Sequence, residues 1–359
     1  MSTQEKPTSA LYATIHSQPS LIRSVLDGAS EWLPRATELL SGARRIFLAG
    51  TGTSSHAAVV GEHLLRAAGL DAYATTNFDF VTYPRPLHDD DALIIFSHRG
   101  SKTFGNLAIE RGAAAGIPVI GITGQDSPMA GPNLVIATAP QEKSATHTAS
   151  YTANLAAMAA IAVALGEQRG EDMSSIGAGL HRVPEAMEAM LERENELRLH
   201  ASALAGRKRL VLAGAGPNAV TAKEGALKIK ESCFITAEGF ELETLLHGGL
   251  QAVHEGDLAV VIAANGPAIG RTGDAARALS LIGTQLVLVA DESIAGIIAP
   301  PGGAMVVGFP SVPEQISPML AVLPLQLLAA FTSQALRTNP DAFRADESLY
   351  KNVNASYKL

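Results

Sequence analysis

Two distant stretches of the sequence share one plan, and this repeat constrains the fold most. Each has a basic start, a short apolar run, a Gly-x-Gly turn and a helical pattern: RRIFLAGTGTSSHAAVVGEHLL from Arg44 and RKRLVLAGAGPNAVTAKEGALKI from Arg207. Aligning the two turns also brings DALIIFSHRGS opposite GDLAVVIAANG, and AAAGIPVIGITGQD opposite ALSLIGTQLVLVADE. Three matched elements in the same order indicate an internal repeat.

The apolar runs are continuous rather than alternating, which is typical of parallel strands that are buried on both faces. Helical segments lie between these runs, so each half is predicted to be a βαβ-type parallel sheet covered by helices. The predicted fold class is α/β with two tandem domains. The predicted divisions are an N-terminal helical segment 1–20, a first domain 21–170, a helical connector 171–206, a second domain 207–335, and a tail 336–359 that covers the active site.

The composition favours a compact enzyme and argues against several other classes. A hydrophobic content of 47% in 359 residues supplies a sizeable core, and the net charge of -8 argues against nucleic acid as the main partner. The lone Cys233 allows no disulfide framework and indicates a buried packing residue. We see no signal peptide and no apolar run of about 18 residues, so we expect a cytoplasmic protein without membrane partners.

Two turns rich in Ser and Thr follow predicted strands, at residues 50–58 (GTGTSSHAA) and 97–103 (SHRGSKT). In parallel sheets ligands bind beyond the carboxyl ends of strands, and helix N-termini bind phosphate there without a basic surface. Ordinary helix caps are the alternative, and the missing third glycine argues against a dinucleotide. The residues expected around a phosphate are Gly52, Thr53, Ser54, Ser97, Arg99, Ser101, Lys102 and Thr103.

Longer motifs suggest a family. The strand–GTGTSSHAA–helix–strand–SxxGxxxT pattern and the following segment KSATHTASYTANL resemble a sugar isomerase (SIS) domain. The second half looks like the isomerase half of glucosamine-6-phosphate synthase and its double-SIS relatives, through KEGALKIKES (223–232), FITAEGFELETLLHGG (234–249) and SLYKNV (348–353). The resemblance covers essentially the whole chain. It implies two SIS domains, each a five-stranded parallel sheet flanked by helices, and a homodimer with a shared site that binds a hexose 6-phosphate without metal or cofactor.

The resemblance also implies roles for individual residues. Glu231 would be the base that moves a proton between C1 and C2, supported by Lys228 one helical turn earlier. His247 would assist ring opening from the other subunit, and Lys351 would form a Schiff base with an open-chain ketose. The segment after the first sheet would add further contacts to the sugar phosphate from Ser144 and Thr148.

These residue types suit aldose–ketose chemistry. Such a reaction needs a base next to a carbonyl, and partial burial raises the proton affinity of a carboxylate. An imidazole that titrates near neutrality suits ring opening. Simpler alternatives remain open at this point: Lys228 and Glu231 as an exposed ion-paired helix face, His247 as a structural histidine, and Lys351 as a solvated lysine of the tail.

Departures from the family pattern point to a different substrate shape or chemistry. SHRGSKT stands where the family has SQSGET, so His98 and Arg99 replace smaller groups and one residue is apparently inserted. Gly249 replaces a proline after His247, and Ala149 replaces an expected lysine. We expect an amino-sugar enzyme that isomerises or deaminates a hexosamine 6-phosphate, or a fructosamine-phosphate deglycase, without glutaminase activity. The alternative is a non-catalytic SIS protein that senses sugar phosphates.

Overall fold

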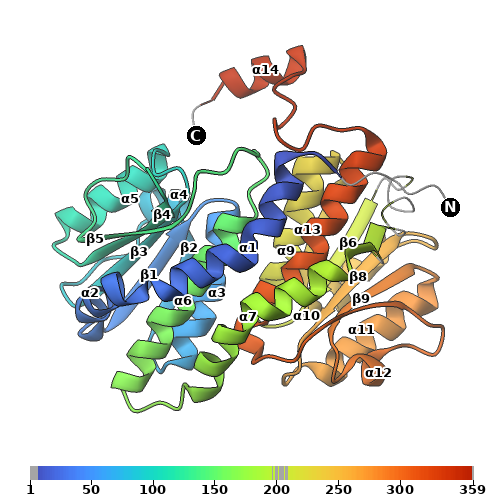
Figure 1. Ribbon diagram of the computed structural model, residues 1–359, viewed down its shortest axis with the longest axis horizontal. Coiled ribbons are helices and arrows are strands. Elements are labelled where there is room, and N and C mark those ends of the chain that lie inside the picture. Colours follow the sequence, from blue (N-terminus) through green and yellow to red (C-terminus); the bar gives the residue numbers. More distant parts are fainter. Residues whose placement is uncertain (1–6, 196, 199–200, 202–205, 207–208, 358–359) are drawn as a thin grey trace.

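The computed structural model describes residues 7–195, 197–198, 201, 206 and 209–357, and contains two parallel five-stranded sheets (Figure 1). Their strand orders, β2-β1-β3-β4-β5 and β7-β6-β8-β9-β10, are the same, which confirms the predicted α/β fold. The first sheet consists of β1 (Arg45–Gly50), β2 (Ala72–Thr76), β3 (Asp91–Ser97), β4 (Val119–Gly124) and β5 (Leu134–Ala139). The second consists of β6 (Arg209–Gly214), β7 (Thr236–Glu241), β8 (Leu258–Ala263), β9 (Gln285–Asp291) and β10 (Met305–Phe309).

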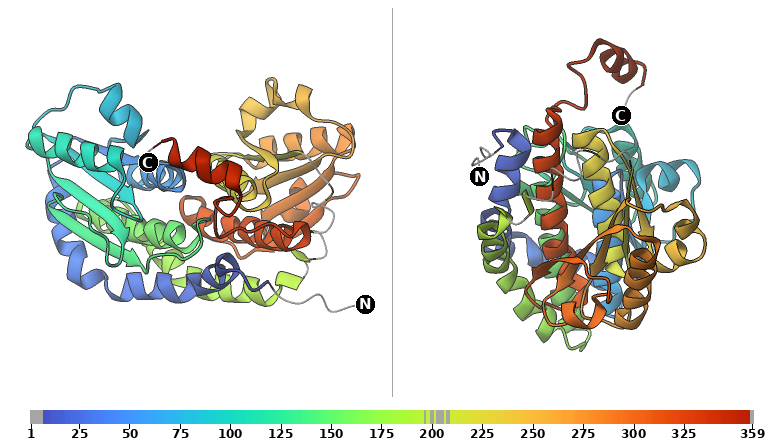
Figure 2. Two further views of the ribbon diagram at one scale, coloured as in Figure 1. Left: turned by 90° about the horizontal axis from the view of Figure 1, so that it is seen from above. Right: turned by 90° about the vertical axis from the view of Figure 1, so that its right-hand side faces the viewer.

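Helices lie between the two sheets and on their outer faces, with the sheets toward opposite ends of the long axis (Figure 2). The first half contains α1 (Ala10–Asp27), α2 (Ala29–Ser41), α3 (Thr53–Ala67), α4 (Asn77–Thr82), α5 (Thr103–Ala114), α6 (Ala149–Gln168) and α7 (Ser174–Glu192). The second contains α9 (Pro217–Cys233), α10 (Leu242–Leu246), η1 (Gly249–Ala252), α11 (Ile269–Ile282), α12 (Ala295–Ile298), η2 (Glu314–Ile316), α13 (Ser317–Leu336) and α14 (Ser348–Ala355).

The two Gly-x-Gly turns have the same backbone conformation. Gly52 has φ 58° and ψ −128°, and Gly216 has φ 52° and ψ −132°, a region that favours glycine. A Cβ atom on Gly50 or on Gly214 would lie 2.3 Å from the backbone of the following helix. Both turns therefore need glycine for close approach and for a positive φ, so the repeat extends to the detailed path of the chain.

The interior of the molecule is built around α6 and α13, which are apolar on nearly all sides. Such helices occur in the core of large proteins and in membranes. By length and composition both could cross a membrane, but 89% and 100% of their most apolar 18-residue stretches are buried inside the protein. Such burial is typical of core helices, which can have the same length and composition as membrane-spanning helices. Polar residues interrupt the apolar run of α13 (Ser317–Leu336), in agreement with the expectation that the sequence has no uninterrupted apolar run of about 18 residues.

The segments outside the sheets differ in detail from the predicted divisions. Helix α1 continues past residue 20, and the connector 171–206 contains α7 but also residues outside the described part of the chain. In the tail, the carboxylate of Asp341 accepts hydrogen bonds from the backbone of Ala10 and Leu11. Beyond it α14 projects away from the body, and none of its residues is buried (Figure 1). Tail closure over a site and the domain boundaries stay predictions.

Candidate functional site

A pocket of about 430 Å³ lies at the carboxyl ends of β1 and β3, between the first sheet and α9. The β1–α3 turn, the β3–α5 turn, the segment before α6, helix α9 and the tail all contribute to its wall. The lining residues are Thr51, Gly52, Thr53, Ser54, Asn77, Phe96, Ser97, His98, Arg99, Lys102, Phe104, Gly105, Ala145, His147, Lys228, Glu231 and Phe343.

One side of the pocket is suited to an anion. Helices α3 and α5 both begin there, so the positive ends of their helix dipoles lie beside the pocket. The Oγ of Ser97 accepts a hydrogen bond from the N–H of Gly100 at 3.2 Å, which fixes the second turn. Arg99 and Lys102 add positive charge, and burial together with Arg99 lowers the pKa of Lys102. An anion bound here would stabilise the protonated form of Lys102.

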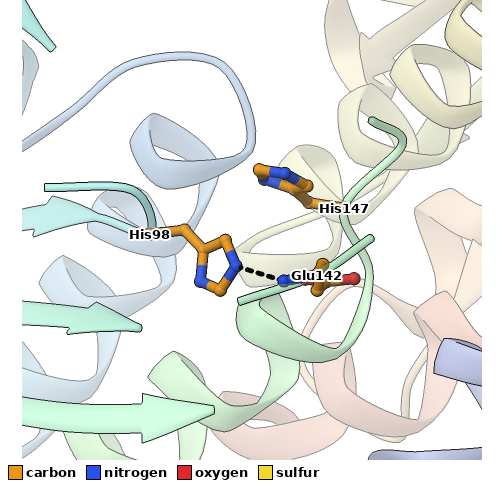
Figure 3. Close-up of side chains that lie close together, drawn as sticks. All are labelled: His98, Glu142 and His147. Carbon is orange, nitrogen blue, oxygen red and sulfur yellow. Dashed lines mark hydrogen bonds between the residues drawn. The ribbon is translucent and has the colours of Figure 1, made fainter. Parts of the chain in front are cut away.

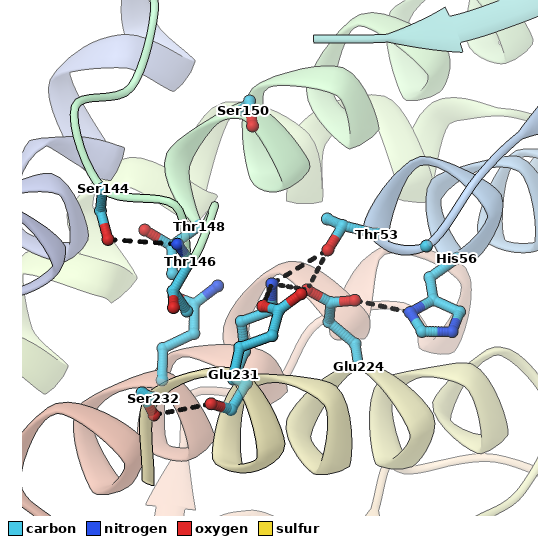
Figure 4. Close-up of polar contacts among 12 residues, drawn as sticks. Thr53, His56, Ser144, Thr146, Thr148, Ser150, Glu224, Glu231 and Ser232 are labelled. Carbon is cyan, nitrogen blue, oxygen red and sulfur yellow. Dashed lines mark hydrogen bonds and ion pairs between the residues drawn. The ribbon is translucent and has the colours of Figure 1, made fainter. Parts of the chain in front are cut away.

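The opposite side carries a buried charge network (Figure 4). Lys228 is only 1% exposed, and its Nζ lies 2.6 Å from Oε2 of Glu231 and 3.3 Å from Oε1 of Glu224. The same Nζ donates to Oγ1 of Thr53 at 3.0 Å, and that hydroxyl donates to Glu224 at 3.1 Å. Nδ1 of His56 completes the network 2.5 Å from Glu224. The network joins α9 of the second half to α3 of the first.

The pKa values of this network follow from burial and pairing. Burial opposes the charge of Lys228, but Glu224 and Glu231 more than offset it and raise its pKa. Burial raises the pKa of Glu224, but Lys228 and His56 together lower it by more. The pKa of Glu224 is therefore below its usual value. For Glu231 burial prevails over Lys228, and its pKa is raised. The two carboxylates therefore differ: Glu224 is held ionised, whereas Glu231 has an increased proton affinity.

The structure places the predicted residues in three groups. The alternative of an exposed ion-paired helix face is wrong, because Lys228 is buried. The predicted residues that line the pocket are Gly52, Thr53, Ser54, Ser97, Arg99, Lys102, Lys228 and Glu231. Those that lie near the pocket without lining it are Ser101 and Thr103, both exposed, and Ser144 and Thr148, both buried beside Pro340 and Glu142. Those outside the pocket of this chain are His247 and Lys351.

His247 lies in an exposed polar cluster, with its side chain 73% exposed and its Nε2 2.7 Å from Glu243. Arg271 binds the same carboxylate, and chiefly for this reason the pKa of Glu243 is lowered to about 2. Lys351 lies on α14, exposed to solvent. Both residues would reach a ligand only through a second chain or through movement of the tail.

Sequence reasoning missed several residues of the site. Glu224 precedes Lys228 by four residues and Glu231 by seven, so all three share one helical stripe, a signal that was available. His56 and His147 lie within motifs quoted above, but their partners are distant in sequence. Phe343 is the tail residue that lines the pocket, and nothing in its local sequence indicates this.

His98, Glu142 and His147 form a candidate metal centre at the pocket (Figure 3). One ligand atom of each lies within 4.8 Å of the others. However, Nε2 of His98 accepts the backbone N–H of Glu142, and the Glu142 carboxylate accepts hydrogen bonds from Thr148 and Ser150. These donors occupy the lone pairs that a metal ion would need.

Comparison with known proteins decides the family. A family model described as "SIS domain" matches residues 39–165 and 203–293, more than half of the chain. The chain belongs to the SIS-domain family. The two matched segments contain β1 and β6 with the Gly-x-Gly turns that follow them.

Curated relatives include glutamine–fructose-6-phosphate aminotransferases (isomerizing). The protein of Pyrococcus horikoshii is 29% identical over 332 residues, which cover 91% of this chain and 55% of the relative. That of Gloeobacter violaceus is 30% identical over 336 residues, covering 88% and 54%. The chain therefore spans about half the length of these relatives, and the similarity is to their isomerase part, as predicted.

Solved structures show the same fold. The C-terminal domain of glucosamine-fructose-6-phosphate aminotransferase from Francisella tularensis superposes with a TM-score of 0.87 at 18% identity, covering 95% of this chain and 99% of that one. Glucosamine-6-phosphate deaminase from Thermotoga maritima gives 0.75 at 18% identity, covering 93% and 97%. Tagatose-6-phosphate ketose/aldose isomerase from Escherichia coli gives 0.74 at 19%, covering 95% and 98%. This SIS protein is thus related to enzymes of phosphosugars and amino sugars.

Proposed function

We propose that this SIS protein is a phosphosugar enzyme that transfers a proton between C1 and C2 of a hexose or hexosamine 6-phosphate. The observation that carries the proposal is the position of Glu231: it is the carboxylate of raised pKa in a pocket whose other side presents two helix N-termini and two cationic side chains. A sugar phosphate is a ligand with an anionic end and a reactive carbonyl end. The two sides of the pocket match these two ends.

In this proposal Glu231 is the general base. Its side chain is 19% exposed and lines the pocket, so it is accessible to a ligand although mostly shielded from water. A base whose pKa is raised toward the working pH both removes a proton from one carbon and returns it to the next. Such transfer contributes about 10²–10⁴-fold to the rate of a reaction.

Lys228 acts as a positioning residue rather than as a group that contacts the substrate. An ammonium group has three N–H donors, and Lys228 has three acceptors within reach, in Glu224, Glu231 and Thr53. Because all three donors are used, its charge holds Glu231 in place and limits the rise of its pKa.

His247 and Lys351 fit the proposal if two chains assemble. We propose a cytoplasmic homodimer in which His247 of one chain serves the pocket of the other, and in which the tail brings Lys351 to an open-chain sugar. The exposure of both residues supports this assembly, because each is available for contact. Deamination of a hexosamine 6-phosphate and deglycation of a fructosamine phosphate are the variants of the reaction that would use Lys351.

The test uses the purified full chain with fructose 6-phosphate, glucosamine 6-phosphate and a fructosamine 6-phosphate. Aldose–ketose conversion and ammonia release are followed separately. We expect turnover of at least one substrate, and a loss of about 10²-fold or more in kcat for Glu231→Gln with KM little changed. Glu238→Gln, an exposed glutamate on the neighbouring strand β7, is the matched control and keeps full activity.

A second candidate function is a non-catalytic sugar-phosphate sensor, favoured by the departures in SHRGSKT. The same experiment separates the two. Tight binding of a hexose 6-phosphate without turnover, unchanged in Glu231→Gln, would support the sensor and contradict the enzyme.

A further inference from the structure

Two histidines from different segments meet at one wall of the pocket. His98 follows β3 and His147 precedes α6, and their rings pack edge to face, with centroids 4.8 Å apart and planes at 75° (Figure 3). Both line the pocket together with Lys228 and Glu231. The proton transfer proposed above uses neither ring, so their presence in the wall needs another explanation.

Hydrogen bonds hold the ring of His98 and the chain segment that carries His147. Nε2 of His98 accepts the backbone N–H of Glu142 at 3.0 Å, which puts the ring proton on Nδ1. The Glu142 carboxylate in turn accepts the backbone N–H groups of Thr148 and Ser150 at 2.9 Å each. This carboxylate thereby clamps the segment that carries His147. The His98 ring and this segment are thus positioned before a ligand arrives, as a recognition element requires.

A metal ion is a poor explanation for the cluster. Binding an ion would require His98 to give up its backbone hydrogen bond and Glu142 to give up donors from Thr148 and Ser150. The clamp would then be lost together with the position of His147. The arrangement is that of a carboxylate that orders a loop.

One ring nitrogen of each histidine lacks a partner. Nε2 of His147 and Nδ1 of His98 are buried and form no hydrogen bond. A buried polar atom left unpaired costs about 1–3 kcal/mol, and most such atoms in proteins are paired. His147 lines the pocket, so a turn of its ring that brings Nε2 to a ligand group would recover this cost.

The charge state of His147 restricts the partner. Burial is the main cause that lowers its pKa to about 4, so the ring is neutral at neutral pH. A neutral imidazole adds a hydrogen bond without adding charge. It therefore suits an uncharged hydroxyl group, whereas Arg99 and Lys102 suit the phosphate.

The location of His147 indicates which part of the ligand it meets. Its ring packs against His98, the residue directly before Arg99, and it lines the same pocket as Lys228. Arg99 belongs to the anion-binding turn and Lys228 to the network that holds Glu231. A carbon chain with its phosphate at Arg99 and its carbonyl end at Glu231 would therefore pass the wall that contains His147.

We propose that His147 is a specificity-determining residue that hydrogen-bonds a hydroxyl group on carbons 3 to 5 of a hexose 6-phosphate, with His98 as the positioning residue that holds its ring. The inference rests on the proposed function, because phosphate and carbonyl define the two ends of the ligand. It selects polyhydroxylated hexose 6-phosphates against their deoxy analogues.

The test is calorimetric titration of the full chain with glucose 6-phosphate, its 3-deoxy and 4-deoxy analogues, and inorganic phosphate. The wild type should bind the parent sugar about 10-fold more tightly than at least one deoxy analogue, the equivalent of 1.4 kcal/mol. His147→Phe should lose this preference and bind inorganic phosphate as the wild type does, which also shows that it is folded. His147→Gln, which keeps a neutral hydrogen-bonding group, should retain part of the preference.

Several outcomes would overturn the inference. A preference for the parent sugar that persists in His147→Phe means that another residue reads the hydroxyl groups. An equal loss of inorganic phosphate means that His147 belongs to the anion site. One equivalent of a transition metal in the wild type, absent from His147→Phe, means a metal centre. A wild type that binds no hexose 6-phosphate overturns the proposed function as well, whereas the first three outcomes leave that function standing.

Discussion

The two halves of the molecule have the same strand order and the same Gly-x-Gly turn, yet only the first turn opens into the pocket. The corresponding edge of the second sheet is filled by Glu314. A Cβ atom on Gly266 would lie 2.6–2.7 Å from its carboxylate, and one on Gly216 would lie 3.4 Å from Oε1. Burial raises the pKa of Glu314. A raised pKa means that this edge does not stabilise the negative charge of the carboxylate, so it does not suit a phosphate either. The two halves thus share a backbone but differ in the ligand chemistry of their turns.

The helices that follow the two turns show the same division. With the turns matched, the buried charges Glu224 and Lys228 of α9 correspond to Val60 and Leu64 of α3, which are also buried. The fold accepts apolar side chains at these positions in the first half. The charges in α9 are therefore a local exception to the packing rules, of the kind that marks functional sites. In the proposed function, one half supplies the turns that bind the anion and the other supplies the base.

The largest expected effect is a loss of stability when the buried charges of α9 are disrupted. Lys228→Met removes the cation shared by Glu224 and Glu231 and leaves two buried carboxylates without it. Breaking a buried ion pair in this way costs about 3–5 kcal/mol, so we expect the free energy of unfolding to fall by that amount in urea denaturation.

Lys230→Met, on the same helix but exposed, is the matched control and should change stability by less than about 0.5 kcal/mol. Equal stability of Lys228→Met and the wild type would contradict the view that the lysine neutralises the α9 carboxylates.

The acid stability of the protein tests the histidines of the first half. In the unfolded chain a histidine has a pKa of about 6.5, whereas burial lowers that of His147 to about 4. Between these pH values the unfolded chain binds more protons than the folded chain. The contribution of His147 to the free energy of unfolding is therefore fully present above about pH 6.5 and is lost as the pH falls toward 4. We expect a loss of about 1–3 kcal/mol from His147, to which the lowered pKa of His98 adds in the same direction.

Chemical denaturation at a series of pH values from 4 to 8 measures this loss. His147→Gln should show a shallower fall on the acid side. An identical slope in variant and wild type would mean that His147 titrates normally in the folded protein.

The equivalence of the two turns can be tested by the same substitution in each. Gly52→Ala and Gly216→Ala both force a side chain into a conformation with positive φ, which costs about 1–2 kcal/mol. Melting experiments should show similar losses for the two variants. Binding of inorganic phosphate should weaken in Gly52→Ala alone, and equal weakening in both variants would contradict the division between the halves.

The smallest effect is expected at the second turn itself. Glu314→Gln removes the carboxylate that fills this edge, and because its pKa is raised by burial, the neutral amide should be tolerated within about 1 kcal/mol. Turnover at the first pocket should not change. A loss of turnover would show that the edge of the second sheet takes part in the reaction.

The sequence predicted the fold well because the repeated strand–turn–helix pattern is local and strongly apolar. The two turns that it singled out line one pocket, and they were recognisable because glycine and hydroxyl residues at the end of a strand are a local signal. It missed Glu224, whose partner Thr53 is 171 positions away, and the clamp by which Glu142 orders the loop of His147. The helical spacing of Glu224 was visible in the sequence, but its contact with Thr53 depends on how the two domains pack. The Glu142 clamp spans only six and eight residues, but no familiar motif marks it.

The most direct test of the central claim is exchange of solvent deuterium into the sugar. Wild-type protein is incubated in D₂O with fructose 6-phosphate and with glucosamine 6-phosphate, and deuterium at C1 and C2 is followed by proton NMR. The account predicts incorporation by the wild type and by Glu238→Gln, and a loss of about 10²-fold or more in Glu231→Gln. Incorporation at an undiminished rate in Glu231→Gln would contradict the claim that the second half supplies the base to a pocket built by the first.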